Sequence, residues 1–132
     1  MGMAGTPISE AWERAYKDVV NETAASKAGY LLGTVGPRIT SAALGLADAR
    51  QVKRWAAEQL EPREHAVSLR LDCLYWVVRA LEPVYSAAVA ARFLRSANPQ
   101  LGDEAPLVVL ARAEDEPAIG PVLAAARAFL EG

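Results

Sequence analysis

Apolar residues recur along the first part of the chain at intervals of three and four positions, which is the spacing of an amphipathic helix. They are Ile8, Trp12, Ala15 and Val19. The pattern predicts a first helix over residues 8–28, with Thr6 as its cap and Pro7 in its first turn, where proline is favoured. Glycines at positions 29, 33 and 36 then predict a flexible connection.

Two short helices are expected between Arg38 and Leu60, separated by a glycine-containing turn at residues 44–48. Asp48 and Gln51 have the spacing of a capping box, in which the first side chain accepts a backbone N–H and the second reaches back. The second short helix is therefore predicted to begin at Ala49.

The longest helix is predicted to open at Pro62, because the apolar residues that follow lie on one stripe at spacings of four, three, four and three positions. The stripe consists of Val67, Leu71, Leu74, Val78 and Leu81. We expect it to form the central core. Pro83 is expected to stop this helix and to start another that runs as far as Asn98-Pro99.

The remaining residues predict two further helices. Residues 98–105 are expected to form a loop, residues 106–113 a short helix and residues 114–117 an acidic turn. Because proline disrupts a helix interior, Pro121 places the expected start of the regular turns of the last helix near Gly120.

Composition supports an all-α, compact helical fold. Of the 132 residues, 52% are hydrophobic, and alanine and leucine dominate them, which favours helices over strands. No run approaches the ~18 apolar residues of a membrane span, and no apolar leader follows the amino terminus, so we expect a cytoplasmic protein. The single cysteine, Cys73, excludes a disulfide framework and a cysteine-based zinc site, and is expected in the core.

Charge is distributed unevenly along the chain. Residues 38–81 hold seven Lys/Arg against five Asp/Glu, whereas residues 82–132 hold four against seven. Different partners for a basic middle and an acidic end would explain this difference. Chance drift in surface charge is the alternative explanation.

The segment beginning at Leu44-Gly45-Leu46 has the apolar skeleton of a helix-turn-helix, with Val52 and Trp55 expected to face inward. Polar residues then remain on the outer face of the second helix, where base edges are usually met. Arginine can form paired hydrogen bonds with guanine and glutamine with adenine, while Lys53 and the flanking arginines are suited to phosphates. The candidate DNA-binding residues are Arg38, Arg50, Gln51, Lys53, Arg54 and Arg63.

A second interpretation of the same residues stays open. Arg50, Lys53 and Arg54 would equally form the solvated face of an ordinary helix, and the turn is one residue longer than the commonest helix-turn-helix spacing.

Catalytic patterns are missing, because His65 is the only histidine and has no nucleophile at a sensible spacing. We expect no enzyme activity, no catalytic residues, no metal site, no cofactor and no small-molecule substrate.

Two stretches together resemble the Xre/MbcA/ParS antitoxin family over residues 33–132. The first runs from Gly36-Pro37-Arg38 through Trp55 to Glu61-Pro62 and is similar to the family's Xre-type helix-turn-helix. The second is Asn98-Pro99-x-Leu101-Gly102-x-x-x-Pro106-Leu107, which is similar to the family's toxin-binding domain and is the more specific signal. Arg70-Leu71 lies between them and also fits the resemblance.

The resemblance implies an antitoxin that binds and silences a RES-domain toxin, whose family activity consumes NAD, and that represses its own operon by binding operator DNA. It also implies that residues 98–132 cover the nucleotide pocket of the toxin. The toxin-binding residues that follow from it are Asn98, Leu101, Pro106, Leu107, Glu114, Asp115, Glu116 and Arg127.

The chain departs from the family pattern at two places. Phe93 stands where a tryptophan is common, an aromatic replacement that is expected to keep the packing role. Acidic residues 114–116 stand where a glycine-rich turn is expected. Our hypothesis is that these acids approach a basic pocket on the toxin and compete with the phosphates of NAD.

These expectations divide the chain into an N-terminal helix and connection at residues 1–37, a helix-turn-helix with the central helix at residues 38–82, and a toxin-binding domain at residues 83–132. The main alternative is a stand-alone helix-turn-helix repressor without a toxin partner, and a helical domain that only oligomerises is a third. We expect a homodimer, because operators commonly have twofold symmetry. Trp12 and Tyr16 are candidates either for its interface or for the core.

Overall fold

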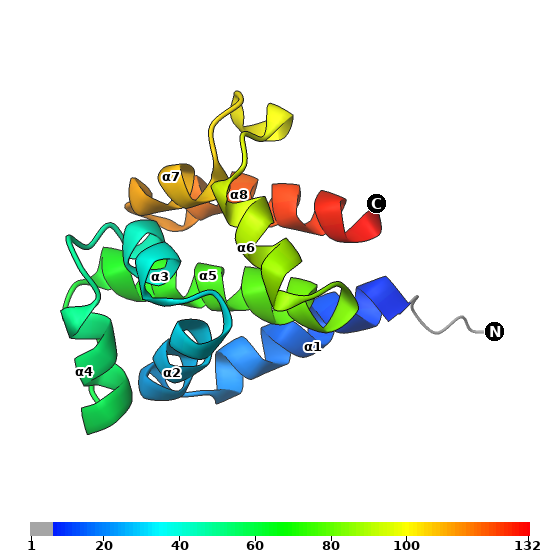
Figure 1. The fold of residues 1–132 in the computed structure, drawn as a ribbon. Coiled ribbons are helices and arrows are strands. Elements are labelled where there is room, and N and C mark those ends of the chain that lie inside the picture. The colour runs from blue at the N-terminus through cyan, green and yellow to red at the C-terminus, as the bar shows by residue number, and fades with distance from the viewer. Residues whose placement is uncertain (1–6) are drawn as a thin grey trace.

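A computed structural model describes residues 7–132, and helices make up its architecture (Figure 1). In chain order they are α1 (Pro7–Asn21), α2 (Ala24–Thr34), α3 (Pro37–Leu44), α4 (Arg50–Glu58), α5 (His65–Val84), α6 (Ala87–Arg95), the short 3-10 helix η1 (Pro99–Leu101), α7 (Pro106–Ala111) and α8 (Glu116–Glu131). An isolated β-bridge between Asn98 and Glu104 is the only strand-like pairing within 7–132. The all-α prediction is confirmed.

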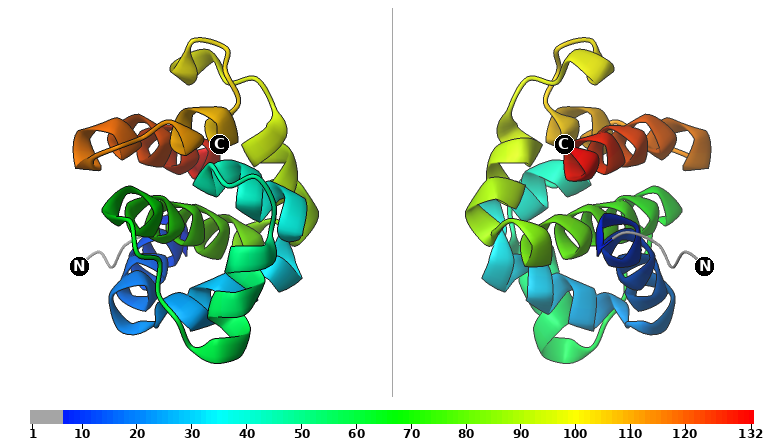
Figure 2. Two further views of the ribbon diagram at one scale, coloured as in Figure 1. Left: turned by 90° about the vertical axis from the view of Figure 1, so that its left-hand side faces the viewer. Right: turned by 90° about the vertical axis from the view of Figure 1, so that its right-hand side faces the viewer.

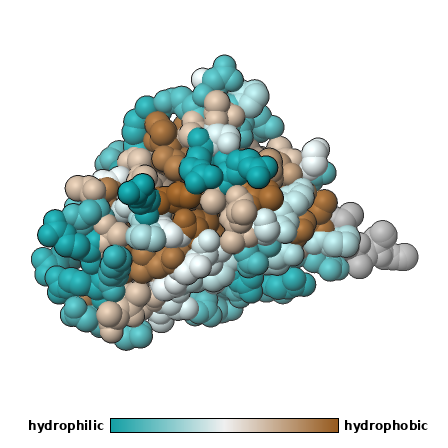
Figure 3. Space-filling view, in the orientation of Figure 1, coloured by the Kyte–Doolittle hydropathy of each residue, from teal (hydrophilic) through white to brown (hydrophobic). Residues whose placement is uncertain are grey.

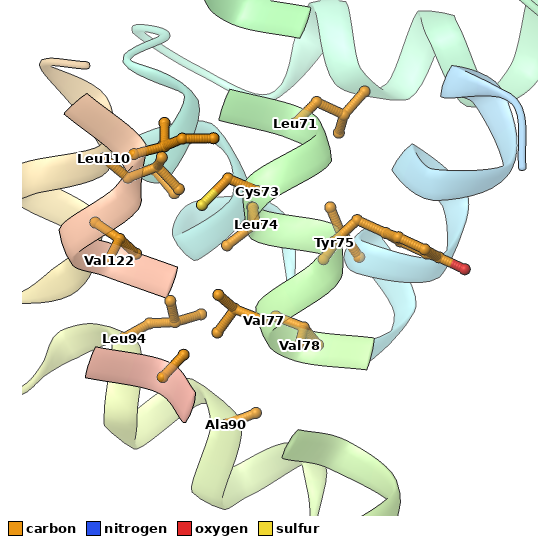
Figure 4. Packing of buried hydrophobic residues seen from close by; sticks show 14 of the residues in the cluster. Leu71, Cys73, Leu74, Tyr75, Val77, Val78, Ala90, Leu94, Leu110 and Val122 are labelled. Carbon is orange, nitrogen blue, oxygen red and sulfur yellow. The ribbon is translucent and has the colours of Figure 1, made fainter. Parts of the chain in front are cut away.

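The long helix α5 is the centre of the fold. It packs against α1 and α2 on one side and against α6, α7 and α8 on the other, and both views of Figure 2 show it between these two groups. All five residues of the predicted stripe are buried. Figure 4 shows Cys73 and Leu74 facing Leu110 and Val122, while Tyr75 points to the opposite side. The helix is therefore apolar on more than one face, as suits its position between two layers.

The predicted single helix over residues 8–28 is wrong, because the helix is interrupted between Asn21, where α1 ends, and Ala24, where α2 begins. The hydroxyl oxygen of Thr23 accepts a hydrogen bond of 3.0 Å from the backbone N–H of Ser26, which is a helix N-cap. Gly29 and Gly33 lie inside α2 rather than in a flexible connection. Of the three glycines, only Gly36 lies between two helices, where its φ is 92°. The cap expected at Thr6 lies outside the described residues.

Two further helix boundaries also differ from the prediction. α5 begins at His65 rather than at Pro62, and it continues past Pro83 to Val84, after which the Ser86 hydroxyl caps α6 by accepting from the N–H of Val89. The buried face of α6 is formed by Ala90, Phe93 and Leu94, so Phe93 has the expected packing role.

The last helix begins at Glu116, four residues before the predicted start. Asp115 caps it by accepting a 3.1 Å hydrogen bond from the N–H of Ala118, and Pro117 occupies the first turn, where no intrahelical donor is needed. Pro121 is accommodated inside α8. No helix within residues 7–132 has the length and apolar character required to cross a membrane.

Candidate functional site

The turn between α3 and α4 is closed by Gly45, whose φ of 73° lies in the left-handed region. Its backbone N–H donates to Ala42 O, and the N–H of Leu46 donates to Ser41 O, so the carbonyl groups at the end of α3 are satisfied. A Cβ at this position would lie 2.9 Å from both Ala111 O and the Nη1 atom of Arg70. Glycine is therefore required at position 45 both by backbone conformation and by space.

α4 presents one apolar face and one polar face. Val52 and Trp55 are buried, as predicted, and α4 packs through this side mainly against α2. The candidate base-contacting residues Arg50, Gln51, Lys53 and Arg54 are all exposed. In Figure 3 hydrophilic residues gather at the end of the molecule where α4 lies in Figure 1. The polar face of α4 is thus open to a partner.

The first arginine of α4 is held by an aspartate of the preceding turn. The Asp48 Oδ2 atom accepts hydrogen bonds from Arg50 Nε at 3.0 Å and from Arg50 Nη2 at 2.7 Å. Its Oδ1 atom accepts the backbone N–H of Arg50 at 2.9 Å. These bonds lower the pKa of Asp48 and raise that of Arg50. Asp48 therefore binds both the backbone N–H and the side chain of Arg50 rather than forming the predicted reciprocal pair with Gln51, and α4 starts one residue later than expected.

The other candidate DNA-binding residues surround the same helix. Arg54 forms an ion pair of 3.4 Å with Glu58, one turn further along α4. Gln51 and Arg54 line a groove of about 560 Å³ that is also lined by Arg63, in the loop before α5. Arg38 is exposed on the first turn of α3. The structure thus brings Gln51, Arg54 and Arg63 together, with the other candidates on neighbouring surface or on α3.

The second candidate region contains a loop that projects from the helical body between α6 and α7 (Figure 1). The Asn98 Oδ1 atom accepts the N–H of Gln100 at 2.9 Å. The backbone N–H of Asn98 donates to Glu104 O, and its carbonyl oxygen accepts from the N–H groups of Leu101 and Asp103. Gly102 and Asp103 both have left-handed φ values, of 64° and 66°. Asn98 therefore holds the loop in a closed shape.

The apolar residues of this region have packing roles. Leu101 is buried, and η1 contacts α8. Pro106 is buried in the first turn of α7, and Leu107 is half-buried against the core. Arg112 pairs with Glu104 and so joins the projecting loop to the end of α7. Of the four residues proposed to shape this domain, only Asn98 and Leu107 keep an accessible side chain.

The acidic turn is used largely within the chain itself. Glu114 Oε2 lies 2.7 Å from Arg70 Nη2, and Asp115 is the cap of α8. Glu116 is exposed in the first turn of α8. On the same helix, Arg127 is exposed, forms an ion pair of 3.6 Å with Glu131 and lies over the ring of Trp12 at 5.9 Å.

Arg70 is a residue whose role the sequence did not reveal. It is only 7% exposed, and its guanidinium donates to Ala113 O at 2.8 Å, to Leu44 O at 3.1 Å and to Glu114 at 2.7 Å. One signal was available, since a charged side chain interrupts the apolar positions of α5 and must find partners if it is buried. Its partners join the end of α3 to the start of the acidic turn.

The two candidates for a dimer surface differ in burial. Trp12 belongs to the core, with its ring 5.0 Å from that of Trp76, whereas Tyr16 is 48% exposed.

Cys73 is buried, as predicted, and burial raises the pKa of its thiol. Within residues 7–132 no three acidic, histidine or cysteine side chains are grouped in a way that could hold a metal ion.

Comparisons with protein-family models, with curated proteins and with solved structures found no match for this chain. The class established by the fold is therefore that of an all-α protein, and its function has to be inferred from the arrangement of its own residues.

Proposed function

We propose that this chain is a cytoplasmic DNA-binding antitoxin that neutralises a RES-domain toxin and represses its own operon as a homodimer. The single observation that carries the DNA-binding part is the polar face of α4. Arg50, Gln51 and Lys53 project from a short helix whose opposite side is fixed by Val52 and Trp55. A recognition helix needs this combination of an anchored back and an open, hydrogen-bonding front.

The toxin-binding part is supported by the projecting loop at residues 98–105 and by the resemblance of its sequence to that of the antitoxin family. Asn98 and the left-handed positions at Gly102 and Asp103 give the loop a defined shape rather than a variable one. A loop of fixed shape loses little entropy when it docks against another protein. Among the acids at residues 114–116, Glu116 is exposed and neither pairs with Arg70 nor caps α8, so it is the acid left to reach a basic pocket on the toxin.

Co-expression with the protein encoded next to this chain tests the proposal directly. We expect growth arrest by that protein to be relieved and the two proteins to co-purify. Glu116→Gln should weaken the complex, whereas Glu13→Gln, which removes an equal charge from the exposed face of α1, should not. A toxin that is neither bound nor neutralised would overturn the antitoxin assignment.

A stand-alone repressor is the second candidate, and the acidic turn favours it. Glu114 pairs with Arg70 and Asp115 caps α8, so two of the three acids assigned to the toxin already have roles within the chain. Binding to the duplex upstream of the coding sequence, with no toxin among the neighbouring reading frames, would support this candidate over the first.

A further inference from the structure

The contact between Asp48 and Arg50 leaves one edge of the arginine side chain open. A guanidinium carries five N–H donors in a planar fork. Asp48 takes the Nε–H and one Nη2–H, which both lie on one side of that fork. The second Nη2–H and both Nη1–H groups remain. The end of the side chain therefore still carries two parallel donors, one on each Nη atom.

Asp48 is itself fixed, which makes the contact directional. Its other carboxylate oxygen accepts the backbone N–H of Arg50 at 2.9 Å, so the carboxylate is anchored to the first residue of α4. The Arg50 side chain is 89% exposed, and no other element of the described chain covers its free end. The two hydrogen bonds to Asp48 thus favour one orientation of the Arg50 side chain while its free end faces outward.

Guanine is the base that fits this arrangement. In the major groove it presents N7 and O6 as adjacent acceptors, and paired donation from arginine to these two atoms is the commonest specific contact. Adenine places a donor beside its N7 and cannot accept both bonds. A phosphate can accept the same two donors, but such a contact carries no base identity and would select no guanine.

We propose that Arg50 is the residue that selects guanine in the operator and that Asp48 is its positioning residue. The inference rests on the proposed DNA-binding function and names the base that this site reads. Arg54 provides a built-in comparison one turn along the same helix. Only its Nε atom contacts Glu58, through a single hydrogen bond of 3.4 Å, so the guanidinium of Arg54 is less firmly oriented than that of Arg50.

The first experiment selects binding sites from a random-sequence duplex library, using the full-length chain and two variants. The wild-type chain is expected to select a motif with a required guanine. Arg50→Gln should lose that guanine at one position, or replace it with adenine, and should keep the rest of the motif. Arg54→Gln removes an equal charge and should weaken binding, but it should retain the guanine selected through Arg50. A motif unchanged by Arg50→Gln would overturn the assignment of this residue.

The second experiment separates positioning from simple charge. Affinity is measured for the selected duplex and for the same duplex with that guanine pair replaced, and the ratio of the two affinities is compared between variants. Asp48→Asn keeps an oxygen that can accept the Arg50 N–H but weakens the grip on the guanidinium. We expect the ratio to fall about tenfold, within the range of one lost bidentate contact.

Glu58→Gln is the matched control, because it removes the same charge from the same helix. Losing either acid reduces repulsion of the phosphates and should strengthen binding to both duplexes. Glu58→Gln should therefore leave the ratio unchanged. Equal ratios in both acid variants would overturn the role of Asp48. If the wild-type chain binds no duplex at all, the proposed DNA-binding function itself fails.

Discussion

The Nη1 atom of Arg70 donates a 3.1 Å hydrogen bond to the carbonyl oxygen of Leu44, the last residue of α3. The same guanidinium donates to Ala113 O and to Glu114, just before α8. One buried side chain of α5 therefore joins the helix that precedes the α3–α4 turn to the segment that leads into the last helix. The two candidate binding regions share this contact.

Replacing Arg70 with methionine should destabilise the fold by about 3 kcal/mol, because two backbone carbonyl groups lose a charged donor in a site that excludes water. Urea unfolding measures the change. Glu114→Gln should cost less than about 1 kcal/mol, since the Glu114 side chain is 77% exposed and its ion pair is screened. Equal losses in the two variants would show that the ion pair, and not the carbonyl bonds, dominates.

Gly45→Ala should destabilise the protein by about 2 kcal/mol or more, because it adds the left-handed strain of an L-residue to a contact with the Ala111 backbone that cannot give way. Gly102→Ala is the matched control. Gly102 has a similar φ of 64°, but no atom lies within 4 Å of its added Cβ. Its cost should be the strain alone, about 1 kcal/mol. Thermal unfolding of both variants distinguishes the two contributions.

The interior position of Lys27 leads to an asymmetric prediction for its ion pair. Lys27 is 6% exposed and its Nζ atom lies 2.7 Å from Asp72 Oδ1, whereas the Asp72 side chain is 41% exposed. Asp72→Ala leaves the buried ammonium without its partner and should cost about 3 kcal/mol. Lys27→Met leaves a carboxylate that water can reach and should cost less. Denaturant titration measures the loss of unfolding free energy in each variant. A larger loss for Lys27→Met than for the Asp72 variant would contradict this explanation.

Alkaline pH should weaken the fold through Tyr30. Burial, together with the neighbouring Glu82, raises the pKa of Tyr30 from 10.0 to about 12. The unfolded chain therefore loses this proton first as the pH rises. The contribution of neutral Tyr30 to the free energy of unfolding is fully present below pH 10.0 and is lost between pH 10.0 and about pH 12. Unfolding of Tyr30→Phe across this range should show a shallower decline than that of the wild type, and identical slopes would exclude Tyr30 as the cause.

The helical period was enough to predict the core of the fold. The stripe on α5 and the inward direction of Val52 and Trp55 follow from spacing alone, because a buried face imposes its period wherever the helix is placed. The break at Thr23 was missed because the apolar pattern continues across it. The start of α8 could have been found, since Asp115 followed two positions later by Pro117 is a helix-start signal.

The candidate sites were predictable only in part. Exposure of the α4 residues follows from their place opposite the apolar face. Arg70 was missed because its partners lie 26, 43 and 44 positions away, and two of them are backbone carbonyls, which have no signature in a sequence. The ion pair of Asp48 with Arg50 could not be predicted, because an aspartate two residues before the start of a helix can accept either a backbone N–H or a side-chain donor.

Lys53 should contribute to DNA binding through charge alone. It is exposed on α4 beside Arg50, and a flexible ammonium group suits a phosphate better than a base edge. Lys53→Ala should weaken binding to every duplex by a similar factor and reduce the slope of log affinity against log salt by about 0.9, the value for one phosphate contact. Lys17→Ala, which removes an exposed lysine from α1, should leave the slope unchanged. A change in base preference with Lys53→Ala would mean that this lysine reads sequence, and an equal loss of slope in both variants would mean that DNA contacts α1 as much as α4.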